Sequence, residues 1–347
     1  MLTLRLHEAQ EVDVSQQKKA LYDLYPKLLD RVVNDVKRSL PGKDGKKATR
    51  KDILHMVMGV TPDFAHSLDF LIMSEELAHE ENGSHAIFPE SAAVLDNLLR
   101  AKYEMSSPEG FTLPFDSFIM AIPHGYTFEG VKLESFMVTM VPYQTSQEYT
   151  TIPFCRKMGI PQPDSYVHED SLPDAKSIAL TYRDPETRAG YIRTLQIDHN
   201  LPKILKCKTA QEFRAELGDY ESKIGVIDLT ESELMSQFLA VKLVAALGVY
   251  HMATKGDRLA DGFPGKVMPR VNNLDKNQRI FFSTLKNKVE QDEVSTKDAF
   301  YRTWFFRQLR DERYYRGEHE KTPRGSRYSF VSDTVVGQKV SAHTQKS

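Results

Sequence analysis

Arginine and tyrosine alternate near the C-terminal end of the sequence, in the run RYYRGEHEKTPRGSRY that begins at residue 313. Guanidinium groups bind phosphates and tyrosine rings stack on bases, so this combination suits nucleic-acid binding on a loop. The same two residue types dominate many protein–protein interfaces, so a docking surface for a partner protein is the alternative. The candidate binding residues in this run are Arg313, Tyr314, Tyr315, Arg316, Arg324 and Arg327.

A second basic cluster lies in the N-terminal part, just before a predicted helix–turn–helix over residues 50–81. A short stretch at 82–89, NGSHAIFP, follows it and would be the wing of a winged helix. Basic side chains ahead of such a unit could hold phosphates. A plain helical subdomain with a solvated basic turn explains the same residues. The candidates here are Lys46, Lys47, Arg50 and Lys51.

Three carboxylate–histidine pairs have the spacing that places both side chains on one helix face, which is the spacing of di-iron bundles. The second and third pairs point away from each other on a single helix, and such residues are also common on solvated faces. We therefore predict no metal site. The pairs are Asp52/His55, Asp63/His66 and Glu76/His79.

Acid–base chemistry has local candidates in His168, which is beside two carboxylates in YVHEDSLPD, and in Asp198 of IDHNLP. Neighbours on an extended chain point in opposite directions, and IDHNLP lacks the later Asn and His of an HNH nuclease. The glycine-rich and nucleophile motifs of nucleotide-binding and hydrolytic enzymes are absent. We predict no catalytic residue and no cofactor; a hydrolase with a site assembled from distant residues such as these two stays an alternative.

Composition limits the possible partners. The chain has 347 residues, of which 40 % are hydrophobic and 27 % charged, as in a globular protein. Its formal net charge of −2 restricts any nucleic-acid site to a local patch. The two cysteines, Cys155 and Cys207, are far apart, and no apolar run reaches the roughly 20 residues that span a bilayer. We expect a cytoplasmic protein without a membrane partner.

The elements that would position these residues change in type along the chain. Apolar spacing predicts helices over 15–40, 50–58, 61–81 and 90–103, with a short strand at SHAIFP. From residue 111, four stretches rich in β-branched and aromatic residues predict an antiparallel sheet. These stretches are FDSFIMAIP, VKLESFMVTMVPY, KSIALTYRD and GYIRTLQID.

The C-terminal half is predicted to form around a helix from Thr230 to Thr254. Thr230 and Glu233 make a capping-box pattern at its start, and it is apolar nearly all round from Phe238 to Tyr250, as in a buried helix. A helix at 202–222 precedes it. Helices near 274–290 and 297–312 follow, the latter with Phe300, Trp304, Phe305 and Leu309 on one face, and RYSFVS and DTVVGQKV are expected as closing strands.

These patterns predict an α+β fold in three regions. Residues 1–105 would form a helical region that could include a winged helix. Residues 106–225 would form an antiparallel β-rich region, and residues 226–347 the buried helix with the Arg/Tyr-rich segment. The predicted function is a non-enzymatic nucleic-acid-associated or regulatory protein. A protein-interaction factor that uses the same arginines and tyrosines is the alternative.

The C-terminal run also resembles the ends of uncharacterised proteins encoded by phages and plasmids. The shared features are an Arg/Tyr-rich turn, a Gly-Ser-Arg sequence at residues 325–327 and a β-rich end. Those proteins have no assigned activity that could be carried over. The resemblance implies an accessory protein of a mobile element.

Overall fold

The structure is a computed structural model of the chain. It describes residues 28–39, 53, 76, 79–80, 82–106, 110–142, 176–183, 191–197, 201–217, 230–264, 280–286, 300–302, 305–331 and 334–336. These residues form both helices and strands, so the α+β class is confirmed.

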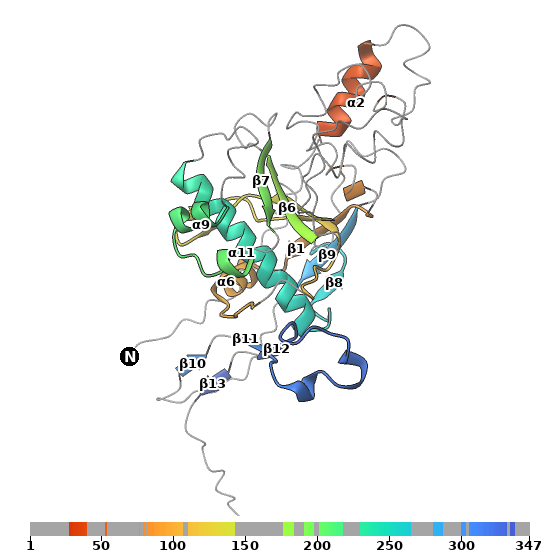
Figure 1. The fold of residues 1–347 in the computed structure, drawn as a ribbon. Helices are drawn as coiled ribbons and strands as arrows, with labels where there is room; N and C mark the ends of the chain where they lie inside the picture. The colour runs from red at the N-terminus through yellow and green to blue at the C-terminus, as the bar shows by residue number, and fades with distance from the viewer. Residues whose placement is uncertain are drawn as a thin grey trace, which may run out of the picture.

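A seven-stranded sheet forms the centre of the protein (Figure 1), in the order β7-β6-β5-β2-β1-β9-β8. Its strands are β1 (His85–Pro89), β2 (Ser117–Met120), β5 (Phe136–Pro142), β6 (Lys176–Arg183), β7 (Tyr191–Ile197), β8 (Leu259–Asp261) and β9 (Phe281–Leu285). A short hairpin, β3 (Thr127–Phe128) with β4 (Val131–Lys132), leads from β2 to β5. The four strands expected between residues 111 and 198 are confirmed.

The sheet is mixed, and the antiparallel sheet predicted from the sequence is the part of it that β2, β5, β6 and β7 form. β2, β5, β6 and β7 are antiparallel neighbours, but β1 runs parallel to both β2 and β9. The helix α6 (Ala92–Arg100) connects β1 to β2 as the crossover that a parallel pair requires. The sequence predicted both α6 and the strand before it, but it did not predict that this strand pairs with β2 in parallel.

The stretch NGSHAIFP is β1 and not a wing. Ala86, Ile87 and Phe88 are fully buried, and the strand lies between β2 and β9. Ile87 faces the main core cluster while Ala86 and Phe88 belong to a second cluster on the opposite face. A parallel strand covered on both faces has this continuous apolar character. The sheet takes strands from all three regions outlined in the sequence, so residues 105 and 225 do not separate independent sheets.

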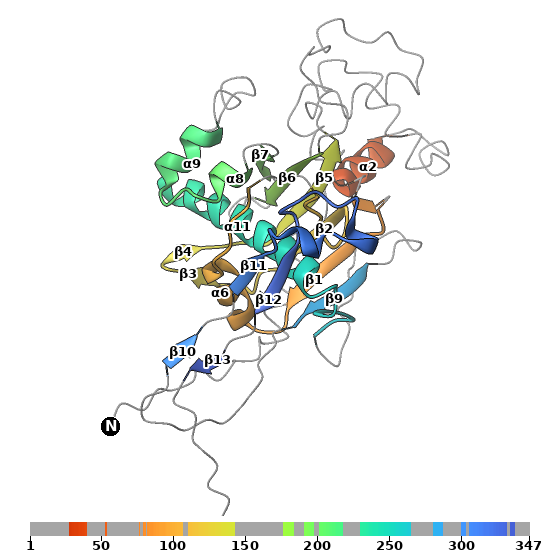
Figure 2. The same cartoon turned by 60° about the horizontal axis from the view of Figure 1, so that its bottom comes forward.

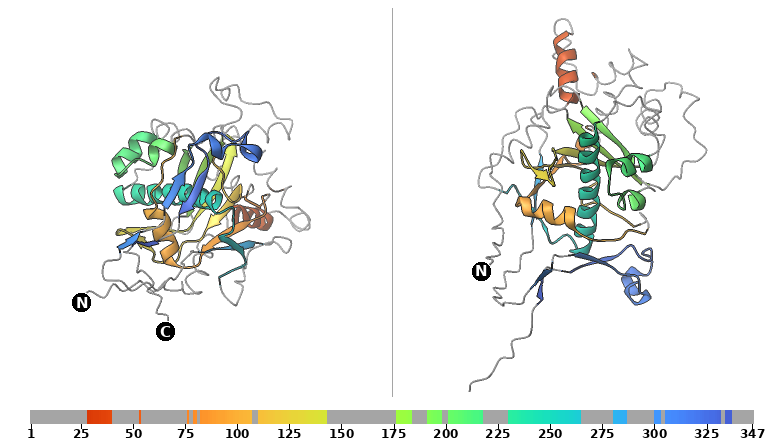
Figure 3. Two further views of the ribbon diagram at one scale, coloured as in Figure 1. Left: turned by 90° about the horizontal axis from the view of Figure 1, so that it is seen from below. Right: turned by 90° about the vertical axis from the view of Figure 1, so that its left-hand side faces the viewer.

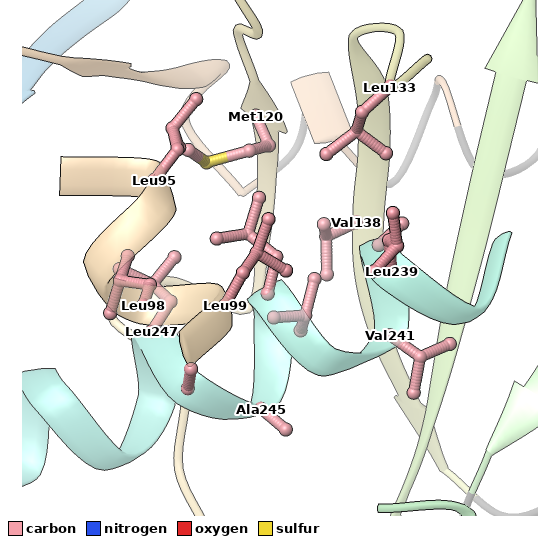
Figure 4. Packing of buried hydrophobic residues seen from close by; sticks show 14 of the residues in the cluster. Leu95, Leu98, Leu99, Met120, Leu133, Val138, Leu239, Val241, Ala245 and Leu247 are labelled. Atoms are coloured by element: carbon pink, nitrogen blue, oxygen red, sulfur yellow. The ribbon is translucent and has the colours of Figure 1, made fainter. Parts of the chain in front are cut away.

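The helix α11 (Glu231–Ala253) is confirmed as the buried helix of the C-terminal half. The Thr230 hydroxyl accepts from the Glu233 backbone N–H at 3.3 Å, and the Glu233 carboxylate accepts from the Thr230 N–H at 2.7 Å, so the capping box is formed. Figure 4 shows α11 packed against α6 and the sheet, where Leu239 and Val138 contribute side chains to the core. Leu243 is fully buried.

Close packing explains a glycine in the middle of α11. A Cβ at Gly248 would lie 2.6 Å from the Phe111 ring and 2.9 Å from the Thr112 carbonyl oxygen. Among the described helices, α11 is also the one with the length and apolarity to span a membrane, but 72 % of that window is buried inside the protein. This is the environment of a core helix in a soluble protein.

Smaller helices complete the described part. α2 (Leu28–Ser39) lies within the helix predicted at 15–40, and α8 (Leu201–Ile204) and α9 (Ala210–Leu217) replace the single helix predicted at 202–222. α9 packs on α11 through Phe213 and Phe238, whose rings are 5.2 Å apart. The predicted helices at 50–58 and 61–81 lie mostly outside the described residues.

The predicted helices at 274–290 and 297–312 are wrong, because strands occupy the described parts of both ranges. They are β9, β10 (Phe300–Arg302) and β11 (Phe305–Gln308). β11 pairs with β12 (Tyr328–Val331), and β10 pairs with β13 (Thr334–Val336), so the two predicted closing strands are confirmed. Figures 2 and 3 show β11 and β12 lying across α11.

Aromatic rings fix β11 and β12 on the core. Phe306 and Phe330 are cross-strand partners whose ring centroids are 6.1 Å apart. Both also contact Tyr250 of α11, at 6.1 Å and 5.4 Å respectively. Buried cross-strand aromatic pairs of this kind stabilise an antiparallel ribbon. They explain why β11 is a strand despite its helix-like apolar spacing.

Candidate functional site

The predicted binding residues divide into two groups in the structure. The N-terminal group, Lys46, Lys47, Arg50 and Lys51, lies outside the described residues, as do His168, Asp198, Cys155 and the first two carboxylate–histidine pairs. The C-terminal group is fully described. It lies in the segment 309–327 between β11 and β12, which we call the Arg/Tyr segment.

The Arg/Tyr segment is an ordered excursion from the core, visible as the dark-blue loop below α11 in Figure 1. Its base is closed where the Leu309 N–H donates to the Arg327 carbonyl at 2.8 Å. Two short 3₁₀ helices, Glu312–Tyr314 and Gly317–His319, give it local structure. The Asp311 carboxylate caps the first by accepting from the Arg313 N–H at 3.0 Å.

Tyr315 holds the segment together from inside. Its exposed fraction is 9 %, and its hydroxyl donates to the Leu309 carbonyl at 2.5 Å. The same oxygen accepts from the Gly325 N–H at 2.7 Å and the Arg327 N–H at 3.3 Å. One hydroxyl in the middle of the segment thus forms hydrogen bonds with residues near both of its ends. The burial of the Tyr315 side chain does not fit the prediction that Tyr315 contacts a partner.

Arg327 also stabilises the segment through a contact with its backbone. It is half-buried, its guanidinium donates to the Tyr314 carbonyl, and it lies 6.0 Å from the centre of the Tyr315 ring. Burial of one Arg and one Tyr of the predicted set leaves four outward-facing residues on a fixed backbone.

The four remaining residues form the outer surface of the segment. Arg313 lies over the Tyr314 ring at 4.8 Å and donates to its hydroxyl at 2.9 Å, so the two side chains form one unit. Arg324 is exposed and 3.5 Å from the Glu312 carboxylate. Arg316 is exposed and has no ion-pair partner among the described residues. Exposed pairs of this kind are weak, so a phosphate can replace the carboxylate.

A groove borders the Arg/Tyr segment on the core side and has a volume of about 520 Å³. It is formed by the chain after α6, by the residue that follows α8, by α11, and by β11 with the chain just after it. Its lining residues are Ala101, Lys102, Tyr103, Glu104, Leu205, Lys242, Phe306, Gln308 and Arg310. Three of these are cations and one is an acid.

Gln308 and Arg310 connect the groove to the segment. The Gln308 amide donates to the Gly325 carbonyl at 2.6 Å and to the Ser106 hydroxyl at 3.1 Å. The Arg310 guanidinium donates to the Gln308 side-chain carbonyl and to the Glu104 carboxylate, both at 2.7 Å. The wall of the groove and the base of the segment are therefore one hydrogen-bonded unit.

Lys242 is the most buried of the charged residues that line the groove. It is the one charged residue of α11 between Leu234 and Tyr250, and it is half-buried, with its ammonium 5.5 Å from the Phe238 ring. Burial lowers the pKa of Lys242, and the Glu129 carboxylate opposes that shift. Burial also raises the pKa of Tyr103, whose hydroxyl donates to the Lys242 carbonyl at 3.5 Å, so the phenol stays neutral.

No group of three or more metal-ligating side chains occurs within the residues that the structure describes. The described carboxylate–histidine pair, Glu76 and His79, is buried, and His79 Nε2 donates to the His85 carbonyl at 3.0 Å. His85 stacks on Phe115 with 3.8 Å between ring centroids, and burial lowers its pKa. This cluster packs the start of β1.

The groove was missed in the sequence, because its residues come from four distant stretches of the chain. Lys242 gave a local signal, since a lone lysine interrupts an otherwise apolar helix. Tyr103 and Lys102 gave no such signal.

Comparison of the chain with known protein families, curated proteins and solved structures found no match. The functional conclusion therefore depends on the geometry of the Arg/Tyr segment and the groove.

Proposed function

We propose that the protein binds nucleic acid through the exposed face of the Arg/Tyr segment, and that it acts by binding rather than by catalysis. One observation supports this most: the segment holds arginines outward on a backbone that is fixed by the buried Tyr315 hydroxyl. A preorganised loop loses little conformational entropy when it binds, so more of each contact contributes to affinity.

Local charge supports the proposal. The Arg/Tyr segment contains six Lys or Arg and four Asp or Glu, a formal charge of +2 in a chain whose net charge is −2. The groove beside it adds Lys102 and Lys242 against Glu104. Basic residues gathered on one surface are the electrostatic feature of a nucleic-acid site.

The shape of the Arg313–Tyr314 unit favours a single strand. A guanidinium held over a phenol ring combines a cation with an aromatic ring, and an unpaired base can stack on such a pair while neighbouring arginines contact phosphates. A protein partner would use the same residues, and it is the alternative outcome of the test below. The role as an accessory protein of a mobile element, acting in the cytoplasm, remains a prediction of the same proposal.

The test is the salt dependence of binding to a labelled single-stranded oligonucleotide. Replacing Arg313, Arg316 and Arg324 with glutamine should reduce the slope of log affinity against log salt by about 2, because each phosphate contact to a single strand contributes about 0.7. The matched control replaces three exposed lysines outside the segment with glutamine, which should leave the slope unchanged. These are Lys132, Lys255 and Lys286.

Two results would contradict the proposal. One is an unchanged slope in the triple arginine variant while the wild-type protein binds in a salt-dependent way, because the phosphates would then contact other residues. The other is a wild-type protein without salt-dependent affinity for DNA or RNA strands. In that case the protein-partner alternative becomes the hypothesis to test on the same arginines.

A further inference from the structure

The groove has an excess of positive charge. Lys102, Lys242 and Arg310 contribute three cations, and Glu104 contributes the one carboxylate, which leaves a formal charge of +2. Glu104 is already paired with Arg310 at 2.7 Å, so it does not neutralise either lysine. A ligand with two negative charges would match this set.

Lys242 fits a binding role better than a packing role. The rest of the helix face around it is apolar and buried, and half-burial of an ammonium weakens its hydration. Within the described part of the chain, no carboxylate forms an ion pair with it; Glu129 influences it only through its charge. An anion in the groove would supply the partner that the ammonium lacks.

The remaining wall of the groove is aromatic. Tyr103 and Phe306 meet edge to face with their ring centroids 5.7 Å apart, and both line the cavity. Cations and aromatic rings in one groove suit a ligand that joins a charged group to a flat ring. The groove volume of about 520 Å³ is in the range of small-molecule sites.

We infer that the groove binds a phosphate monoester attached to a nucleoside, with Lys242 and Lys102 as the phosphate contacts. The ester is either the terminal phosphate of a strand that lies on the Arg/Tyr segment or the phosphate of a free mononucleotide. The first source rests on the proposed function, and Arg310 links the two surfaces because it belongs to the segment and lines the groove. A phosphate monoester carries about −1.5 to −2 at pH 7, which matches the charge of the groove.

The test compares three versions of one oligonucleotide, with a 5′ phosphate, a 3′ phosphate or hydroxyls at both ends, together with adenosine 5′-monophosphate. A terminal phosphate in the groove should tighten binding about tenfold over the hydroxyl-ended strand, the effect expected of a few charge-assisted hydrogen bonds. Lys242→Met keeps the unbranched chain as far as Cε and removes the charged ammonium, so it should abolish that difference. Lys286→Met, at an exposed site outside the groove, should retain it.

Lys102→Gln, at the exposed end of the groove, is the second variant and should reduce the same difference without entering the core. A Lys242-dependent gain for one phosphorylated strand identifies the strand terminus as the source. Lys242-dependent binding of the mononucleotide alone identifies the free nucleotide as the source. Phosphorylated and hydroxyl-ended strands of equal affinity, together with mononucleotide binding that is absent or unchanged in both variants, would overturn the inference.

The two proposals can fail separately. If strands bind through Arg313, Arg316 and Arg324 but terminal phosphates have no effect, the groove assignment is wrong and the proposed function stands. If the mononucleotide binds through Lys242 but no strand binds, the proposed function is wrong and the groove assignment stands.

Discussion

α11 and the strand pair β11–β12 touch each other in the core, yet their structures are specified in different ways. The α11 helix was predicted from a capping box and from residues that are apolar nearly all round. The β11 stretch was also predicted to be helical, from apolar residues on one face, whereas β12 was predicted to be a strand. α11 has a capping box at its start and apolar residues over many turns, so local information is sufficient. β11 is four residues long, and a spacing over so short a stretch fits a strand as well as a helix.

What decides the structure of β11 is its partner strand β12, which begins 20 residues after β11 ends. Phe306 pairs with Phe330, and both rings contact Tyr250 of α11. Such contacts are invisible to a sequence pattern. A helix can be predicted reliably where a capping box and a long apolar stretch both indicate it, as in α11. The structure of a short aromatic stretch without a cap, such as β11, depends on its non-local neighbours.

The largest effect is expected from a charge in α11. Leu243→Asp places an unpaired carboxylate where the exposed fraction is 0 %, and it should lower the free energy of unfolding by more than about 4 kcal/mol or prevent folding. Chemical denaturation followed by circular dichroism measures this. Ser232→Asp is the control, since this exposed site lies in the first helical turn, where a negative charge is favourable. A stable, cooperative Leu243→Asp protein would mean that α11 is not the core helix.

The next largest effect tests whether residues 305–308 form the strand β11 or the helix predicted from the sequence. Phe306 is 4 % exposed, and Phe306→Ala should cost about 3–5 kcal/mol of stability. Phe305 points to the other side of the strand and is half-exposed, so Phe305→Ala should cost about 1 kcal/mol. The helical prediction had placed Phe305, together with Trp304, on the buried face. A larger cost for Phe305→Ala than for Phe306→Ala would restore that helix.

A smaller difference in stability is expected between two tyrosines of the Arg/Tyr segment, one that holds its backbone and one at its surface. Tyr315→Phe removes the hydroxyl that binds three backbone groups and leaves the buried Gly325 N–H without its acceptor, so it should cost about 1–3 kcal/mol. Tyr314→Phe removes a hydroxyl that accepts from Arg313 at the surface, and it should cost less than about 0.5 kcal/mol. Thermal melting of the two variants measures the difference. Equal costs would show that the Tyr315 hydroxyl does not organise the segment.

The sequence predicted most of the elements whose signals are local. The capping box of α11, the strands β2, β5, β6 and β7, and the closing strands β12 and β13 follow from residue types and spacing. The place of β1 could not be predicted, because its neighbour β9 comes almost 200 residues later. The period of a buried apolar stretch also does not say whether its neighbours are parallel or antiparallel.

The candidate site was predicted in part. The Arg/Tyr run is visible in the sequence. The separation of buried Tyr315 and half-buried Arg327 from the exposed arginines 313, 316 and 324 is not visible, because all five residues have similar local surroundings. The groove depends on Lys242 meeting β11 and the chain after α6. Only the packing of α11 under β11 and β12 creates that meeting.

Contacts between phosphates and the exposed arginines of the Arg/Tyr segment can be measured through their effect on salt dependence. The most direct measurement is the salt dependence of single-strand binding for the wild-type protein and for the variant with glutamine at Arg313, Arg316 and Arg324, both checked for equal thermal stability. The account predicts a linear loss of log affinity with log salt, with a slope that is smaller by about 2 in the variant. Equal slopes in two folded proteins that both bind the strand would contradict it.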